Sequence, residues 1–101
     1  MRRPKAQPEY DLAVDHMRFK AVLKEAEELR WRKLNDYGAS YRNFGSLGVA
    51  VRLGDKMARL TRLIQNPKSS RVKDESLVDT ALDLVNYAGM LVMLLREEFK
   101  K

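Results

Sequence analysis

The sequence predicts an all-α protein: a three-helix bundle unit that completes its core by oligomerisation. Apolar residues recur at helical spacing in three stretches, which are separated by segments rich in Gly, Asn, Ser and Pro. No stretch shows the alternation that is typical of a strand. At 101 residues, the chain is the size of one domain with a thin core. Residues 1–8, with two prolines and three basic residues, are expected to form a flexible basic arm, and residues 9–101 a single helical domain.

The first helix is expected from Glu9 to Asp36, where strong helix formers dominate and nothing breaks the pattern. It has an apolar face along its length and a second apolar arc on its first half. The face comprises Phe19, Val22, Leu23, Ala26, Leu29 and Leu34, and the arc comprises Tyr10, Val14, Met17 and Ala21. A helix that is apolar on two sides needs two neighbours, so the second arc favours contact with another subunit.

Gly38 is placed to end this helix, at the start of the glycine-rich loop 35–48. The second helix is expected over about residues 47–65. The third is expected to begin near Asp74 and to run to about Phe99. It is apolar around most of its circumference, which predicts a homodimer or homotetramer.

Charge and composition limit the partners. The net charge of +6 lies almost entirely in the first five and last two residues, because residues 8–99 hold 15 basic and 14 acidic side chains. A nucleic-acid partner is therefore possible but not favoured. The chain has no cysteine, which excludes disulfides and thiolate metal sites and fits a cytoplasmic location. No uninterrupted apolar run approaches the roughly 18 residues of a bilayer span, so no membrane partner is expected.

A polar line interrupts the apolar third helix. Glu75, Asp79, Asp83 and Asn86 are spaced by four, four and three residues, which places them on one side. Carboxylates one turn apart suit Mg²⁺, and Glu25 and Glu28 of the first helix could converge on the same ion. The alternatives are a solvated helix face, acids that favour the helix dipole, and surface charge pairs.

The second helix carries cations beside its apolar face. Arg52, Lys56 and Arg59 could hold a polyphosphate, or could form an ion-pair network with Asp55. Aromatic residues near the loop could stack on a base, or could cover a small core; they include Tyr37 and Tyr41.

Three blocks in order resemble the family called nucleotide modification associated domain type 1, which is common in phages and prophages. The resemblance covers roughly residues 19–95. The matching positions are Lys33, Asp36, Tyr37 and Gly38, then Arg52, Asp55, Lys56, Arg59 and Leu60, then Glu75, Ser76, Asp79, Asp83, Leu84 and Tyr87.

The family is similar, more distantly, to the MazG-type all-α nucleoside triphosphate pyrophosphohydrolases, which cut between the α and β phosphates with Mg²⁺ held by acids on two helices. This chain departs from their Glu-Glu-x-x-Glu and Glu-x-x-Asp pattern, since Glu25 is not doubled and Glu75 and Asp79 are four apart. Whether the chain is an enzyme therefore stays open.

These resemblances imply a Mg²⁺-dependent nucleotide-binding protein of phage nucleotide metabolism, with pyrophosphohydrolase activity as its enzymatic form, in the host cytoplasm if phage-encoded. A non-enzymatic nucleotide regulator or sponge and an accessory nucleic-acid module are the alternatives. The assigned residues are Glu25, Glu28, Glu75, Asp79 and Asp83 for the metal, with Glu28, Glu75 and Asp79 catalytic; Lys33, Arg52, Lys56 and Arg59 for phosphate; and Tyr37, Asn86 and Tyr87 for base or sugar.

Overall fold

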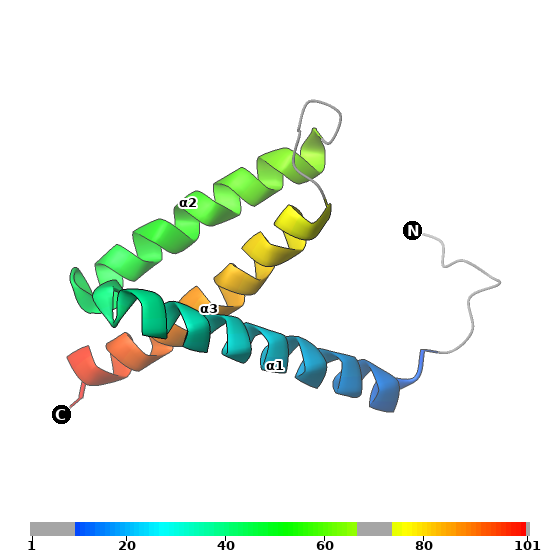
Figure 1. Ribbon diagram of the computed structural model, residues 1–101, viewed down its shortest axis with the longest axis horizontal. Coiled ribbons are helices and arrows are strands. Elements are labelled where there is room, and N and C mark those ends of the chain that lie inside the picture. Colours follow the sequence, from blue (N-terminus) through cyan, green and yellow to red (C-terminus); the bar gives the residue numbers. More distant parts are fainter. Residues whose placement is uncertain (1–9, 67–73, 101) are drawn as a thin grey trace.

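The computed structural model describes residues 10–66 and 74–100, and all regular elements in these ranges are helical. The elements are α1 (Leu12–Tyr37), a short 3-10 turn η1 (Ser40–Arg42), α2 (Gly45–Gln65) and α3 (Asp74–Glu98). The all-α prediction with three helices is confirmed. The expected flexible arm lies outside the described residues. α2 and α3 lie side by side, and α1 crosses α3 (Figure 1).

The ends of α1 follow from local chemistry. Asp11 caps the helix, because its carboxylate accepts hydrogen bonds from the backbone amides of Ala13 at 2.9 Å and Val14 at 3.2 Å. The helix ends at Gly38, whose φ of 65° favours glycine and whose amide donates to the Leu34 carbonyl at 2.8 Å. The prediction that Gly38 stops the first helix is confirmed.

α2 begins two residues earlier than the sequence pattern suggested, and a distant side chain is the reason. Glu98, in the last turn of α3, accepts a hydrogen bond from the Ser46 amide at 2.8 Å and a second from the Ser46 hydroxyl. Its carboxylate thus caps the positive end of α2. Gly45 adopts a φ of 63°, and a Cβ there would lie 3.0 Å from Glu98 Oε2. A neighbouring pair, Arg42 with Glu97, ties η1 to the same turn of α3.

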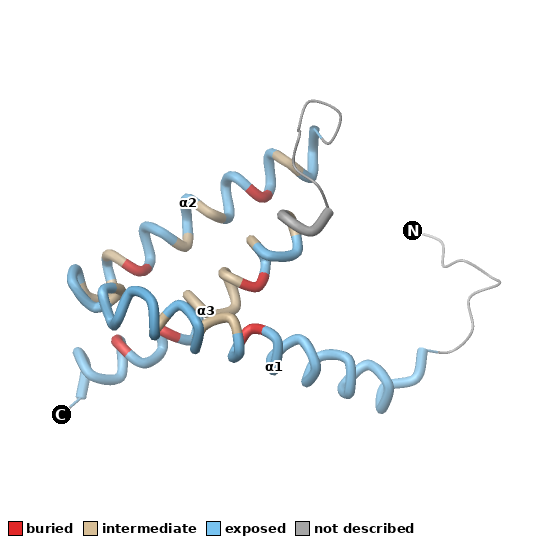
Figure 2. Tube along the Cα trace, viewed as in Figure 1, coloured by how far each residue is buried: buried red, intermediate tan, exposed pale blue. Residues whose placement is uncertain are grey.

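The core lies mainly between α2 and α3. Val49 and Leu60 of α2 are buried, as are Leu82, Met90 and Leu94 of α3. α1 contributes one buried apolar residue, Ala26, which is 1% exposed and whose small side chain lets the two helices approach closely. Residues 12–25 of α1 extend past α3 on the side away from α2 and are exposed throughout (Figures 1 and 2). The three helices therefore form an open arrangement, not a closed bundle.

The mean hydropathy of α3 is higher than its interrupted apolar pattern indicated. Over Leu77–Glu98 it is long and apolar enough to cross a membrane by length and composition, with a mean hydropathy of 1.4 and only 6% of the tested window buried. The sequence analysis considered uninterrupted apolar runs, which Asp79, Asp83 and Asn86 break, whereas the average over the helix is apolar despite them. A single helix of this kind is weak evidence for membrane insertion, since core helices of soluble proteins pass the same test.

Candidate functional site

A cleft of about 990 Å³ opens where α1, η1, α2 and α3 meet. Its size is in the usual range for small-molecule sites. The polar and aromatic residues of its lining come from all four elements, and they include Arg30, Lys33, Tyr37, Tyr41, Arg52, Lys56, Asp83, Asn86 and Tyr87. Positions more than 50 residues apart in sequence thus face one space.

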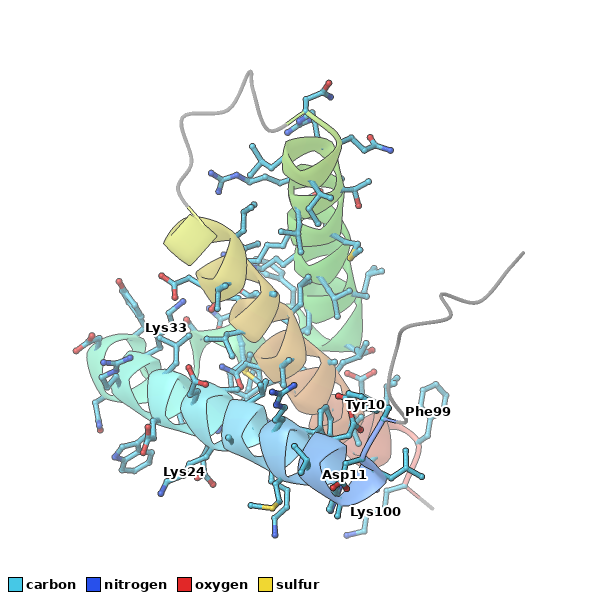
Figure 3. All side chains as sticks on the ribbon, turned by 90° about the vertical axis from the view of Figure 1, so that its right-hand side faces the viewer. Tyr10, Asp11, Lys24, Lys33, Phe99 and Lys100 are labelled. Carbon is cyan, nitrogen blue, oxygen red and sulfur yellow. The ribbon has the colours of Figure 1, made fainter. Side chains whose placement is uncertain are left out.

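The charged centre of this cleft is Asp83. Lys33 Nζ of α1 lies 2.9 Å from Asp83 Oδ1, and Lys56 Nζ of α2 lies 3.4 Å from Asp83 Oδ2. The Asp83 side chain is only 15% exposed, whereas those of Lys33 and Lys56 are 50% and 30% exposed. In Figure 3, Lys33 points toward α3 while Lys24, on the same helix, points away into solvent. Two ammonium groups from different helices are therefore brought together by one carboxylate.

Aromatic rings surround this charged centre. Lys56 Nζ lies 5.8 Å from the centroid of the Tyr87 ring, within the distance of a cation–π contact. Arg52 Nε donates a long hydrogen bond, 3.4 Å, to the Tyr87 hydroxyl, which raises the pKa of Arg52 and keeps it charged. Tyr87 is thus held between two cations, with its ring at the wall of the cleft.

Arg30 is a further cation that the sequence analysis did not select. Its guanidinium lies 5.6 Å from the centroid of the Tyr41 ring. Its Nε is buried and has no hydrogen-bond partner among the described residues. A buried donor without a partner is costly, so this nitrogen favours an acceptor from a ligand. The available signal was spacing: Arg30 lies four residues after Ala26 and three before Lys33, on the same helix face.

Asn86 has a structural contact inside the cleft. Its side-chain amide donates to the Ala26 carbonyl at 2.9 Å, which joins α3 to α1 at their crossing. Because Ala26 is almost fully buried, this bond fixes the position along α3 at which α1 crosses it. The assignment of Asn86 to base or sugar contact stays a prediction, and its amide group is already engaged.

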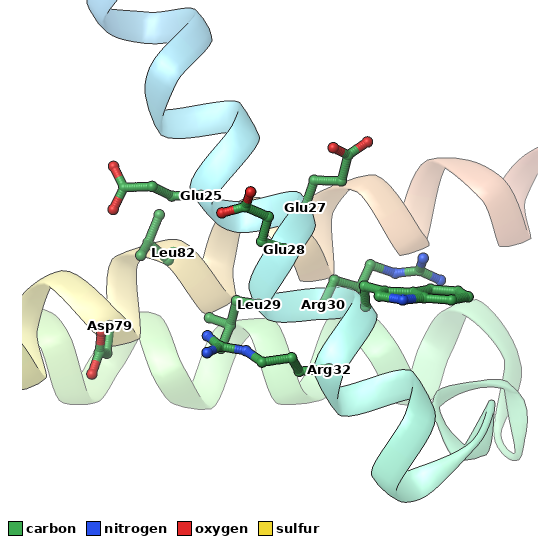
Figure 4. Close-up of a pocket in the computed structure, with 9 residues that line it drawn as sticks. Glu25, Glu27, Glu28, Leu29, Arg30, Arg32, Asp79 and Leu82 are labelled. Carbon is green, nitrogen blue, oxygen red and sulfur yellow. The ribbon is translucent and has the colours of Figure 1, made fainter.

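The acidic residues gather elsewhere. A second hollow, of about 970 Å³, is lined by Glu25, Glu27 and Glu28 of α1 and by Asp79 of α3. Figure 4 shows the three glutamates spreading in different directions and Asp79 pointing away from them. Among the side chains of residues 10–66 and 77–100, no three His, Cys, Asp or Glu are grouped as metal ligands would be.

The other residues assigned to metal or phosphate do not all lie in these two hollows. The side chain of Glu75 lies outside the described residues, so its role as a ligand stays a prediction. Asp83, also expected to bind metal, faces Lys33 and Lys56 instead of the other acids. Arg59 is exposed and lines neither hollow. The predicted phosphate residues Lys33, Arg52 and Lys56 do meet in the cleft, although the sequence could not show that Asp83 joins them.

The cleft has the chemistry of an anion site with an aromatic wall. Ammonium and guanidinium groups bind phosphate oxygens through charge-assisted hydrogen bonds, and tyrosine rings offer flat surfaces to a base. The second hollow has the opposite charge. The two hollows share only Arg30, so they are chemically distinct sites.

Comparison with known proteins matches the cleft better than the acidic hollow. A protein-family model described as nucleotide modification associated domain 1 matches residues 33–95, more than half of the chain. The matched segment contains Lys33, Arg52, Lys56, Asp83 and Tyr87 of the cleft and Asp79 of the acidic hollow, whereas it excludes Glu25, Glu27 and Glu28. No curated protein and no solved structure matched the chain.

Proposed function

This chain belongs to the nucleotide modification associated domain 1 family, and on that basis we propose that its cleft binds a nucleotide by the phosphates. One observation carries the proposal: Lys33 and Lys56, from separate helices, converge on Asp83 within 3.4 Å. In the free protein, Asp83 holds the two ammonium groups in place. A phosphate group brings several anionic oxygens to the same position and takes over these hydrogen bonds.

Further cations extend the phosphate site. Arg52 is fixed beside Tyr87, and the buried Nε of Arg30 lies at the wall shared with the acidic hollow. Lys33, Lys56, Arg52 and Arg30 together carry four positive charges against one carboxylate, which suits a di- or triphosphate better than a monophosphate. Charge in the cleft thus supports a nucleotide with more than one phosphate.

The base would lie against the aromatic wall. Tyr37 is 71% exposed at the end of α1, and Tyr41 and Tyr87 line the same cleft. Stacking on such rings tolerates every base, since each has a flat face. This part of the proposal therefore gives a site for the base without selecting one.

Mg²⁺ dependence and pyrophosphohydrolase activity form the second part of the proposal. They are supported by the acidic hollow, which Glu25, Glu28 and Asp79 line together with Arg30, a residue that also lines the nucleotide cleft. With Glu75 one turn before Asp79, these carboxylates would hold an ion near the phosphates once their side chains turn toward one another. Bound Mg²⁺ would supply Lewis-acid stabilisation of the phosphoryl group. A non-enzymatic nucleotide regulator remains the alternative within the same cleft.

Self-association is the third part of the proposal. Large apolar side chains remain exposed on every helix, among them Phe19, Leu47 and Val92. A homodimer or homotetramer would cover such surface, and a cytoplasmic location fits a nucleotide ligand.

Calorimetric titration with a nucleoside triphosphate tests the cleft. We expect Lys33→Gln and Lys56→Gln each to weaken binding about tenfold, the usual effect of losing one charge-assisted hydrogen bond. Lys24→Gln is the matched control, because Lys24 is an exposed lysine of α1 that lines neither hollow. Equal affinities in all three variants would overturn the proposal.

The same samples separate enzyme from binder. Monophosphate and pyrophosphate are measured with Mg²⁺ and with EDTA. Product that requires Mg²⁺ and is lost in Asp79→Asn supports hydrolysis, whereas tight binding in EDTA without product supports the regulator.

A further inference from the structure

The outer side of α3 carries a regular apolar row that none of the described helices covers. Its members are spaced alternately by three and four residues: Val78, Ala81, Val85, Ala88, Val92, Leu95 and Phe99, here called the outer row. Phe99 directly follows the last residue of α3. Val78, Val92, Leu95 and Phe99 are 56%, 46%, 39% and 72% exposed, both alanines are exposed, and only Val85 is half-buried. The row lies on the side of α3 opposite the buried Met90.

The spacing of the outer row identifies what would cover it. An alternation of three and four residues repeats every seven, which is the pattern that lets two helices pack along a common seam. Branched Val78, Val85 and Val92 alternate with the small Ala81 and Ala88, which allow a second helix to approach closely.

Lipid would require a different distribution of side chains. The other sides of α3 are engaged by α1 and α2 through the Asn86 and Asp83 contacts, so most of its open apolar surface lies along one stripe, with Met93, 43% exposed, outside it. Insertion of α3 into a membrane would also carry Asp83, with its two paired lysines, into hydrocarbon, where charged side chains are costly.

We propose that the outer row packs antiparallel against the same row of a second copy of this chain. Charge sets the direction. Asp74 lies four residues before Val78 and Arg96 lies four residues after Val92, so the two ends of the row are flanked by opposite charges. An antiparallel pair places these opposite charges, and the opposite ends of the two helix dipoles, next to each other. A parallel pair would bring the two copies of Asp74 together.

Exposed apolar surface outside the outer row could contribute to such an interface. The first half of α1 also extends past α3 away from α2, and Phe19 and Val22 there continue the face of Ala26 (Figure 1). This apolar face of α1 would pack against the second copy.

One substitution tests the surface. We place Val78 opposite the partner's Leu95, which brings Val85 opposite the partner's Ala88, so Ala88→Glu places a charge at the centre of the pair. We expect its dissociation constant, from sedimentation equilibrium, to rise at least about 100-fold because a buried, uncompensated charge is costly. Ala58→Glu makes the same change at an exposed position of α2 and should leave the association unchanged. Circular dichroism checks that both variants stay helical.

Single cysteines test the direction, since the chain has none of its own. Antiparallel pairing puts position 81 opposite the partner's position 92, and puts the two copies of position 81 about 16 Å apart. An equal mixture of the Ala81→Cys and Val92→Cys variants should therefore form a disulfide-linked heterodimer on oxidation, while each alone should not. Ala81→Cys cross-linking to itself would show parallel pairing and overturn the proposed direction.

The inference rests on the proposed self-association, and its tests are made on the protein without nucleotide. A wild-type chain that stays monomeric at all concentrations would overturn self-association, and a dimer unaffected by Ala88→Glu would overturn the outer row alone. Flotation of the wild type, but not of Ala88→Glu, with phosphatidylcholine vesicles would instead assign the row to lipid. The titration with nucleotide is read separately, so its result does not alter these outcomes.

Discussion

Replacing Asp83 by Asn removes the charge that joins three helices while keeping the side chain's size. Two ion pairs are lost, with Lys33 at 2.9 Å and Lys56 at 3.4 Å. Each is discounted for solvent screening because the Lys33 side chain is half exposed and that of Lys56 is 30% exposed. We expect the free energy of unfolding to fall by about 1–1.5 kcal/mol in total. For a chain of this size that lowers the melting temperature by roughly 4–12 °C.

The assay is a double-mutant cycle. Unfolding by urea is measured for the wild type, Asp83→Asn, Lys56→Gln and the double variant, all at one protein concentration because self-association would shift the result. We expect a coupling energy of about 0.5–1 kcal/mol between Asp83 and Lys56. The control cycle pairs Asp83→Asn with Lys24→Gln, which should be additive. Additive behaviour in both cycles would refute the description of Asp83 as the electrostatic centre of the cleft.

The same variant changes ligand binding in a direction that depends on metal. Without Asp83, the two lysines are no longer neutralised, so affinity for a nucleotide in EDTA should rise several-fold. If Asp83 instead holds Mg²⁺ next to the phosphates, as the sequence suggested, the variant should lose affinity only when Mg²⁺ is present. A fall in affinity in EDTA would contradict both expectations.

Three further predictions concern the fold. The hydrogen bond from Arg42 lowers the pKa of Glu97. Its contribution to stability is therefore present above its ordinary pKa of 4.5 and is lost as pH falls through the lower pKa of the folded state. Glu97→Gln should reduce this loss of stability when unfolding is followed at acid pH. Gly45→Ala should destabilise by about 1–2 kcal/mol at its positive φ, whereas Gly54→Ala, with no atom within 4 Å of the new Cβ, should stabilise by about 0.5–1 kcal/mol in urea unfolding. Ala26→Leu should cost about 1–3 kcal/mol and should increase hydrogen exchange in α1, because this position is 1% exposed; unchanged exchange would show that the crossing tolerates bulk.

Local features of the fold could be predicted because their causes lie within a few residues. Gly38 ends α1 through its own backbone conformation, and the apolar spacing identified three helices. The start of α2 could not be placed, because the group that caps it, Glu98, lies 52 residues away. A glutamate in the last turn of a helix has the same sequence pattern whether it faces solvent or a neighbouring helix.

The site was predictable in composition but not in arrangement. Lys33 and Lys56 were selected as phosphate ligands, and the cleft does contain both. Asp83 was grouped with Asp79 because they are one turn apart, yet the structure places them at different hollows. The crossing of α1 over α3, set by the small Ala26 and its bond to Asn86, decides which neighbours each carboxylate meets. Helix periodicity contains no information about that crossing angle.

The contacts of Glu97 and Glu98 connect the last turn of α3 to the rim of the cleft. These two carboxylates hold η1 and the first turn of α2, and the nearby residues Tyr41 and Phe44 form part of the cleft wall. A small rotation of α3 would therefore carry the rim with it. The outer row lies on the same helix. We therefore expect binding of a second chain and binding of a ligand in the cleft to be thermodynamically linked, so that each changes the affinity for the other by the same factor.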